Sequence, residues 1–127
     1  MAPFDGVSTN EIYLIRAEAN ARQGKTTDAM RDLNELLAMR HTDTFVPLAA
    51  SSPSHALDLI LLERRKELLM RGLRWVDIKR LNKEGAGITL KRTVEGVEYM
   101  LSPNDLRYAL PIPEDVITLS GIEQNKR

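Results

Sequence analysis

The sequence predicts a mainly α-helical protein, in which helical hairpins pack around a central helix and a small β-hairpin and an irregular proline-containing segment follow. Apolar residues recur at helical spacing within residues 8–40 and 54–82, whereas strand-like alternation is confined to residues 88–101 and prolines interrupt the chain beyond them. The chain has 127 residues, of which 43% are hydrophobic, so it can bury one core. We therefore expect residues 1–127 to form a single domain.

A helical hairpin is predicted over residues 8–40. Ser8 and Glu11 have the spacing of a capping box, which predicts a first helix over about 9–23. The apolar residues of this helix fall on two sides, and we expect neighbours to cover both. Gly24 allows a left-handed turn into a second helix over about 27–40. That helix carries one apolar stripe, formed by Ala29, Met30, Leu33, Leu36 and Leu37.

Residues 54–82 are expected to hold the central helix and a short one. The third helix, over about 54–71, has two opposed apolar stripes, so it is predicted to lie at the centre. The first stripe contains Leu57, Ile60, Leu61 and Leu68, and the second contains Leu59, Leu62, Leu69 and Met70. The fourth helix, over about 74–82, is expected to direct Trp75, Ile78 and Leu81 toward the core.

Arg64 falls in the middle of the first stripe of the third helix. Because an unpaired buried guanidinium is costly to desolvate, a carboxylate partner is required. We expect Glu11, Glu18 or Glu67 to supply it.

Residues 83–127 are predicted to form a hairpin and an irregular tail. Two alternating segments flank Glu95-Gly96, a typical hairpin turn pair. The prolines that follow exclude an interior helix, and one helical turn is expected after Glu114.

Composition excludes several function classes. Lys and Arg total 18 and so do Asp and Glu, so the net charge is zero and a dedicated nucleic-acid binder is disfavoured. No apolar run is long enough to cross a bilayer, and no signal peptide is expected in this sequence. Cys is absent, which removes disulfides and thiolate chemistry.

Neither a metal site nor a cofactor is expected. His41 and His55 have only Asp43 and Asp58 nearby as further ligands, too few for a convincing zinc site. The glycines at 85 and 87 lack the Lys-Ser/Thr ending of a phosphate-binding loop.

Glu63 and Glu67 share a helical face, as a catalytic carboxylate pair would. The basic residues between them favour the ionised forms, so structural ion pairing is the interpretation we adopt, and no catalytic residue is assigned. Trp75, Tyr99 and Tyr108 are candidates for stacking on a sugar ring, with packing as the alternative for each.

Five segments, in order, resemble the C-terminal part of the SusD/RagB family of glycan-binding surface lipoproteins from Bacteroidetes. They are EIYLIRAE at 11–18, LNEL at 33–36, LERRKEL at 62–68, GLRWVDIKR at 72–80, and PIP at 111–113 followed by QN at 124–125. The sequence departs from the family pattern at Arg71, where the family usually carries Glu, and at its end, Lys126-Arg127, where Pro-Gly usually continues.

The resemblance implies tetratricopeptide-like helix pairs within a longer protein that a lipidated cysteine tethers to the outer membrane. It implies a noncatalytic role in oligosaccharide uptake, as a lid over a TonB-dependent transporter. Under this hypothesis the chain is the C-terminal portion, which supplies helical scaffold and partner surface. By itself it is expected to be soluble, to bind glycans weakly and to self-associate. The family's glycan-contacting aromatic residues lie largely in other parts of the protein.

Two other functions are compatible with the residues. The hairpin at 8–40 has about the length of one tetratricopeptide repeat, so a protein-interaction module is one alternative, although a second copy does not follow. A small carboxylate-dependent hydrolase is the other, and it would need one carboxylic acid in an apolar pocket.

Overall fold

The computed structural model describes residues 6–42 and 44–127, and it divides the chain into two compact units, 1–74 and 75–127. The first unit holds α1 (Thr9–Arg22), α2 (Thr26–Ala38) and α3 (Pro53–Glu67). After α4 (Arg74–Lys83), the second holds β1 (Leu90–Val94), β2 (Val97–Leu101), a 3-10 helix η1 (Leu106–Tyr108) and α5 (Glu114–Ser120). The predicted mainly helical class with one small hairpin is confirmed. The single domain over 1–127 stays a prediction, and each unit is described by itself.

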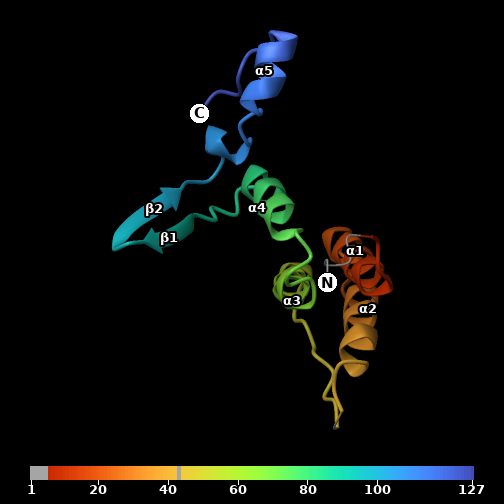
Figure 1. Cartoon of the computed structure of the whole chain (residues 1–127). Helices are drawn as coiled ribbons and strands as arrows, with labels where there is room; N and C mark the ends of the chain where they lie inside the picture. Colours follow the sequence, from red (N-terminus) through yellow and green to blue (C-terminus); the bar gives the residue numbers. More distant parts are fainter. Residues whose placement is uncertain (1–5, 43) are drawn as a thin grey trace. The chain divides into compact units, whose positions relative to one another are not determined.

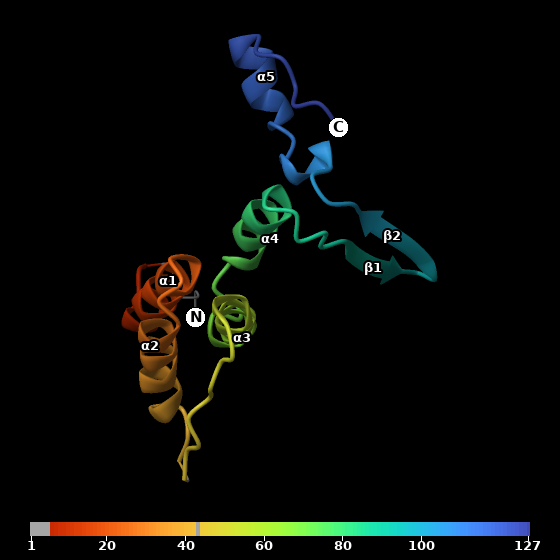
Figure 2. The ribbon, with the colours of Figure 1, turned by 180° about the vertical axis from the view of Figure 1, so that it is seen from behind.

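The first unit is a three-helix cluster. α1 packs against both α2 and α3, and α2 also contacts α3, as both views of the ribbon show (Figures 1 and 2). The predicted stripe of α2 faces the core as expected, with Leu33 fully buried and Leu37 partly buried. Small residues line the other side of this contact, since Ala17 and Ala21 of α1 let the two helices approach closely. The buried cluster consists of Leu14, Ala17, Ala21, Ala29, Met30, Leu33, Leu36, Ala56, Ile60 and Leu68.

The capping box predicted at the start of α1 is not formed. The helix does begin at Thr9, but the Ser8 hydroxyl donates to the side-chain oxygen of Asn10 and accepts no capping hydrogen bond. Arg71 binds the residues just before α1, because its guanidinium donates to the carbonyl oxygen of Gly6 at 2.6 Å and to the Ser8 hydroxyl at 3.2 Å. The arginine at this departure from the family pattern therefore ties the end of the unit to the start of α1.

Two-sided burial of α1 and α3 was also a wrong prediction. Ile12 and Ile15 on α1 are about half exposed, at 49% and 48%. On α3 the first stripe is buried around Ile60 and Leu68, whereas Leu62, in the second stripe, is 49% exposed. Periodicity reports which residues are apolar, and it cannot report whether the chain supplies a neighbour for each face.

α3 starts and ends earlier than predicted. Ser52, not Ser54, is its N-cap and accepts a hydrogen bond from the backbone N–H of His55, with Pro53 in the first turn, where its missing N–H costs nothing. The helix ends at Glu67, and Met70 adopts a left-handed conformation at φ 63°, which a continuing helix would not allow. Leu69 and Met70, expected within the helix, lie beyond it and are exposed.

The second unit has a small core of its own, in which Ile78 and Leu81 of α4 are buried as predicted. The hairpin follows the predicted turn: Leu90 pairs with Leu101 and Val94 with Val97. Glu95 and Gly96 both have positive φ, at 51° and 80°, as a two-residue type I′ turn requires.

The C-terminal segment is held by side-chain amides. Gln124 accepts from the N–H of Ile112 at 2.8 Å and donates to its carbonyl oxygen at 2.9 Å, and Asn125 donates to the carbonyl oxygen of Leu110. α5 is a seven-residue helix, longer than the single turn predicted after Glu114. None of the helices in the described residues is both long enough and apolar enough to span a membrane.

Candidate functional site

Arg64 and Glu11 lie together inside the first unit, between α3 and α1. The Nη2 atom of Arg64 is 3.9 Å from Oε1 of Glu11, and Arg64 is only 7% exposed. The guanidinium thus sits where the apolar stripe of α3 meets α1, with a carboxylate from the facing helix.

Glu67 and Glu18, the other two carboxylates considered for Arg64, form ion pairs with other arginines. Glu18 pairs with Arg22 one turn along α1, at 2.8 Å. Glu67 accepts from Arg40 at 2.6 Å and from the side-chain amide of Asn10 at 2.5 Å. Its hydrogen bonds with Arg40 are the main reason that the pKa of Glu67 is lowered, with Asn10 adding to the effect and burial opposing it.

The most buried carboxylate of the unit, Asp32, was not singled out from the sequence. Asp32 is fully buried and accepts two hydrogen bonds of 2.8 Å from Arg16 of α1, while Asn20 donates to it at 3.3 Å. Its position, one residue before the core residue Leu33, places an acid beside an apolar stripe, and that was the available signal. This pair joins α1 to α2 and is structural.

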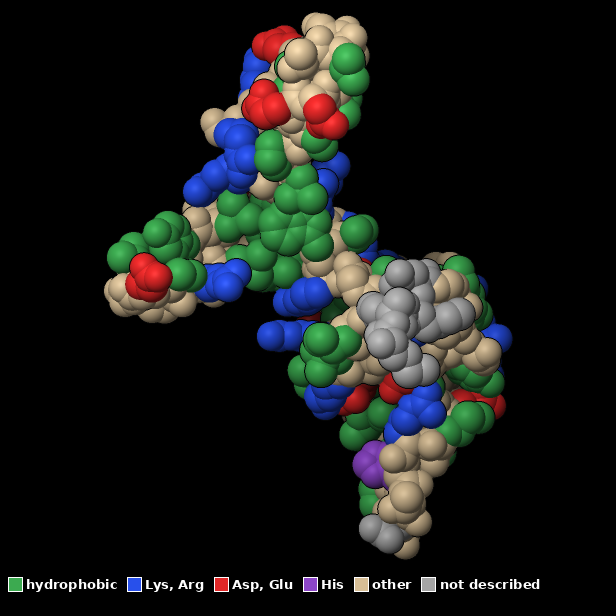
Figure 3. Space-filling view, in the orientation of Figure 1, with side chains coloured by type: hydrophobic (Ala, Val, Ile, Leu, Met, Phe, Trp, Pro, Cys, Tyr) green, Lys and Arg blue, Asp and Glu red, His purple; other side chains and the backbone are tan. Residues whose placement is uncertain are grey.

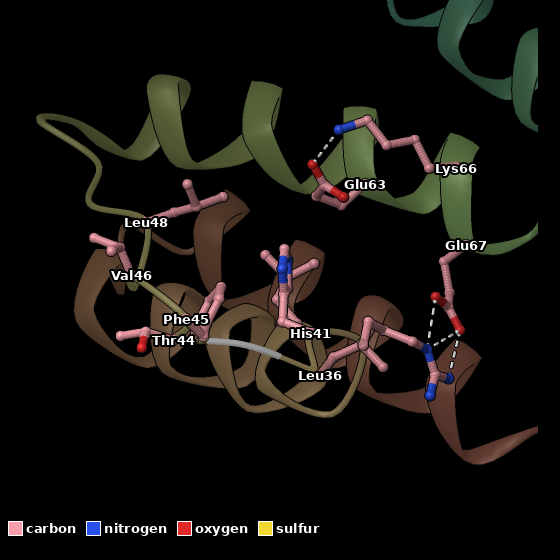
Figure 4. A pocket seen from close by; sticks show the side chains of 11 residues that line it. Leu36, His41, Thr44, Phe45, Val46, Leu48, Glu63, Lys66 and Glu67 are labelled. Atoms are coloured by element: carbon pink, nitrogen blue, oxygen red, sulfur yellow. Dashed lines mark hydrogen bonds and ion pairs between the residues drawn. The ribbon is translucent and has the colours of Figure 1, made fainter.

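A hollow in the first unit has a volume of about 700 Å³ and lies between the end of α2, the segment after it and α3. Figure 4 shows Phe45, Val46 and Leu48 on the loop side of the hollow and Glu63, Lys66 and Glu67 on α3. Its lining consists of Leu36, Leu37, Arg40, His41, Thr44, Phe45, Val46, Leu48, Glu63, Lys66 and Glu67.

The charges around this hollow are paired with one another. Lys66 donates to Glu63 at 2.5 Å, and Arg40 holds Glu67, as the dashed lines in Figure 4 mark. The lowered pKa of Glu67 keeps this carboxylate ionised, which is the opposite of what a general acid requires. The hollow therefore offers apolar surface with an ionic rim, and not an acid–base pair.

Among the predicted sugar-stacking residues, Trp75 and Tyr108 are brought together and Tyr99 stands apart on β2. The Trp75 and Tyr108 rings lie 4.9 Å apart at 47°, and the indole N–H donates to the carbonyl oxygen of Tyr108 at 3.2 Å. Tyr108 is 5% exposed, so it packs in the core of its unit. Tyr99 is 59% exposed and faces Arg92 across the hairpin.

The histidines are used locally. His41 stacks on Phe45 with ring centroids 5.1 Å apart, and the Nδ1 atom of His55 accepts from the backbone N–H of Ser51. Asp43 lies outside the described residues. Within those that are described, no group of three or more potential ligands is suited to a metal ion.

Each of the five segments that resemble the family takes part in a feature described above. The first three lie in the helices of the first unit, the fourth contains Trp75, and the last contains Gln124, whose side-chain amide binds the backbone of Ile112. A family model described as the SusD family matches residues 9–126. The chain belongs to the SusD family. The expectation drawn from the five segments is confirmed.

A solved structure gives the same answer. The crystal structure of a SusD-like protein from Bacteroides fragilis NCTC 9343, at 2.70 Å resolution, is similar to this chain with a TM-score of 0.61 and 27% identity. The similarity covers 97% of this chain and 27% of that chain, so this SusD family chain spans about a quarter of that protein's length. Among curated proteins no match is found.

Several family segments have a structural explanation. In LNEL, Asn34 accepts from the N–H of Leu48 at 2.8 Å and donates to its carbonyl oxygen at 2.9 Å. Asn82, just after GLRWVDIKR, makes the same pair of bonds with Ile88, and Gln124 makes it with Ile112. These three amides fix the path of extended backbone next to the helices, so in this SusD family chain they are fold determinants.

Proposed function

We propose that this chain is part of a noncatalytic glycan-binding component of a Sus-type uptake system. The observation that carries the proposal is the SusD family match over residues 9–126. In this proposal the chain is the C-terminal portion of a longer surface lipoprotein of the outer membrane. It supplies helical scaffold and the surface that meets a TonB-dependent transporter.

The side chains support a binding role without catalysis. Around the hollow between α2 and α3, Glu63 and Glu67 are each matched by a cation, so neither is poised to donate a proton to a glycosidic oxygen. A carboxylate-dependent hydrolase would need one acid with a raised pKa, whereas the resolved shifts among the carboxyl groups of the described residues are downward.

A tetratricopeptide-like interaction module is the weaker candidate. α1 and α2 do form a helical hairpin, but α3 is followed by α4 and a β-hairpin in place of a second copy of the same pair. Stacked repeats need about three copies to bury a continuous face. The order of elements in this chain favours the glycan-uptake proposal.

The experiment is electrophoresis of the full-length protein through gels that contain single polysaccharides, with a parallel assay of released reducing ends. We expect at least one polysaccharide to slow the protein, with no release of reducing ends. Co-purification with a TonB-dependent transporter tests the partner. Failure of a broad panel of polysaccharides to slow the protein, or turnover of any of them, would overturn the proposed function.

A matched pair of variants tests Tyr99, the exposed candidate. If Tyr99 stacks on a sugar, Tyr99→Ala should weaken retention by roughly tenfold and Tyr99→Phe should preserve it, because the ring supplies the contact. Equal retention by both variants and by the unaltered protein would remove Tyr99 from the binding surface.

A further inference from the structure

A smaller hollow, of about 240 Å³, lies within the second unit between α4 and the segment around η1. Lys79 and Lys83 line it from α4, where a spacing of four residues puts them on one face of the helix. Asn104, Leu106 and Tyr108 line it from the opposite segment. The volume is below the range of about 300–1,000 Å³ that is usual for drug-sized ligands, so it suits one ring of a glycan and not a chain.

The hollow carries uncompensated positive charge. The side-chain ammonium groups of Lys79 and Lys83 form no ion pair or hydrogen bond with another residue in the described part of the chain. The nearby carboxylate, Asp105, is already bound by Arg107 through two bonds of 2.7 and 2.9 Å. Two ammonium groups therefore remain to attract an anion.

The hollow also offers polar and apolar contacts suited to a sugar ring. The hydroxyl of Tyr108 is buried and makes no hydrogen bond within residues 6–42 and 44–127, which is a costly state for a polar group. Asn104 donates to the carbonyl oxygen of Asn82 at 3.3 Å, which leaves its side-chain oxygen as an acceptor. Leu106, 59% exposed, provides apolar surface for the C–H groups of the ring.

We propose that Lys79, Lys83, Asn104 and Tyr108 form a subsite for a carboxylate-bearing sugar ring of an acidic oligosaccharide. The inference rests on the proposed glycan-binding function and names a substrate class for it. A uronate ring matches the hollow because its carboxylate meets the two ammonium groups while its hydroxyls reach Asn104 and Tyr108. A neutral hexose offers only the second set of contacts.

The test is an NMR titration of the ¹⁵N-labelled chain with sodium D-galacturonate and, separately, with D-galactose, which differs from it at C6 alone. Ionic strength is held constant. We expect galacturonate to shift the amide signals of Lys79, Lys83 and Leu106 with a dissociation constant of roughly 1–10 mM, since two exposed ion pairs supply little binding free energy. Galactose should bind at least about fivefold more weakly.

Three variants identify the residues responsible. Lys79→Gln combined with Lys83→Gln should weaken galacturonate binding about tenfold, and Tyr108→Phe about fivefold, with the spectra otherwise those of a folded chain. Lys91→Gln is the matched control: Lys91 is an exposed lysine of the same unit, 3.4 Å from Glu98 and outside the hollow. Binding to the control variant should equal that of the unaltered chain.

The alternative outcomes are decisive. Equal binding of galactose and galacturonate, insensitivity to the double lysine variant, or shifts by sodium acetate as large as those by galacturonate would each overturn the subsite. If polysaccharides slow the full-length protein while galacturonate leaves these signals unmoved, the proposed function stands and the subsite falls. If galacturonate saturates these signals and no polysaccharide is retained, the proposed function falls instead.

Discussion

Asp105 is a half-buried carboxyl that forms an ion pair with a residue two positions away. Arg107 donates to both of its carboxylate oxygens, and the backbone N–H of Arg107 donates to it as well. These hydrogen bonds stabilise the ionised form and lower the pKa of Asp105 from 3.8 to about 2. The same hydrogen bonds close the turn into η1, because Asp105 is the N-cap residue of that helix.

We expect a carbon-detected NMR titration to give Asp105 a midpoint near 2, and Arg107→Gln to return its pKa toward 3.8. Because the pKa of Asp105 is lower in the folded chain than in the unfolded chain, the ion pair stabilises the fold fully at pH values above the unfolded pKa. This stabilisation is lost as the pH falls through the folded pKa. Lys91→Gln, on the hairpin, serves as the control for a general loss of positive charge. A midpoint for Asp105 that is unchanged in Arg107→Gln would contradict this account.

The side-chain amide of Asn34 stabilises the fold as both a donor and an acceptor of hydrogen bonds. Replacement by Asp keeps the acceptor for the N–H of Leu48 but removes the donor to its carbonyl oxygen. We expect Asn34→Asp to lower the free energy of unfolding by about 1–3 kcal/mol in urea denaturation, since two oxygens then face each other.

The control for Asn34→Asp is Glu35→Gln, an isosteric change at the exposed neighbouring position. Its effect should stay within about 0.5 kcal/mol. Equal stability of Asn34→Asp and the unaltered chain would show that the amide contributes only geometry and no net free energy.

For single residues, the sequence showed which charge needed a partner and limited that partner to three carboxylates. The position of Arg64 on an apolar stripe showed that it needed a carboxylate, and Glu11 was among the three named. Spacing could not choose between them, because the choice depends on how α1 lies against α3. The hydrogen bonds between Asn34 and Leu48 could not be predicted either, because Leu48 belongs to a loop whose path cannot be read from periodicity.

α3 has one face that is buried and one that is partly exposed. Ile60 is fully buried against the core, and Leu62, two residues away, is 49% exposed. We expect Ile60→Ala to lower the free energy of unfolding by about 2–5 kcal/mol, the range for deleting a large apolar side chain from a packed site. Leu62→Ala is the matched control and should cost less than about 1 kcal/mol. Similar losses in the two variants, measured by circular dichroism in urea, would mean that α3 is covered on both sides.

At the scale of elements, the existence and order of the helices and of the hairpin were predictable from periodicity and turn residues. Their ends were less so. Ser52 caps α3 in place of Ser54 because proline suits the first turn, and the left-handed Met70 lies beyond an end that the apolar pattern did not mark. Which faces are covered depends on neighbours, and a sequence pattern holds no information on whether those neighbours are present.

For the whole chain, uncovered apolar faces predict association. Ile12 and Ile15 form an exposed apolar patch on α1, and burying such surface is favourable at roughly 25 cal/mol per Å². We expect light scattering to give a mass that rises with concentration above the 14.3 kDa of one chain. Ile12→Lys combined with Ile15→Lys should restore the mass of one chain, because charged side chains resist burial.

The control for that charge change is Val94→Lys combined with Val97→Lys at the tip of the hairpin. Both valines are exposed, at 40% and 54%, so the same charge is added away from α1. If the hairpin variant dissociates the chain and the α1 variant does not, the associating surface is the hairpin and not α1.

The hairpin exposes nearly all of both its faces, with hydrophobic side chains visible on its surface in Figure 3. A two-stranded ribbon without a covered face is marginally stable, so its cross-strand amides open to solvent far more often than those of α1. The backbone amides of Arg92 and Tyr99 should therefore exchange hydrogen rapidly in the chain without a bound partner. A molecule that binds across this hairpin would lower their exchange rate. The exchange rate of these two amides therefore reports whether the hairpin is covered, without an added label.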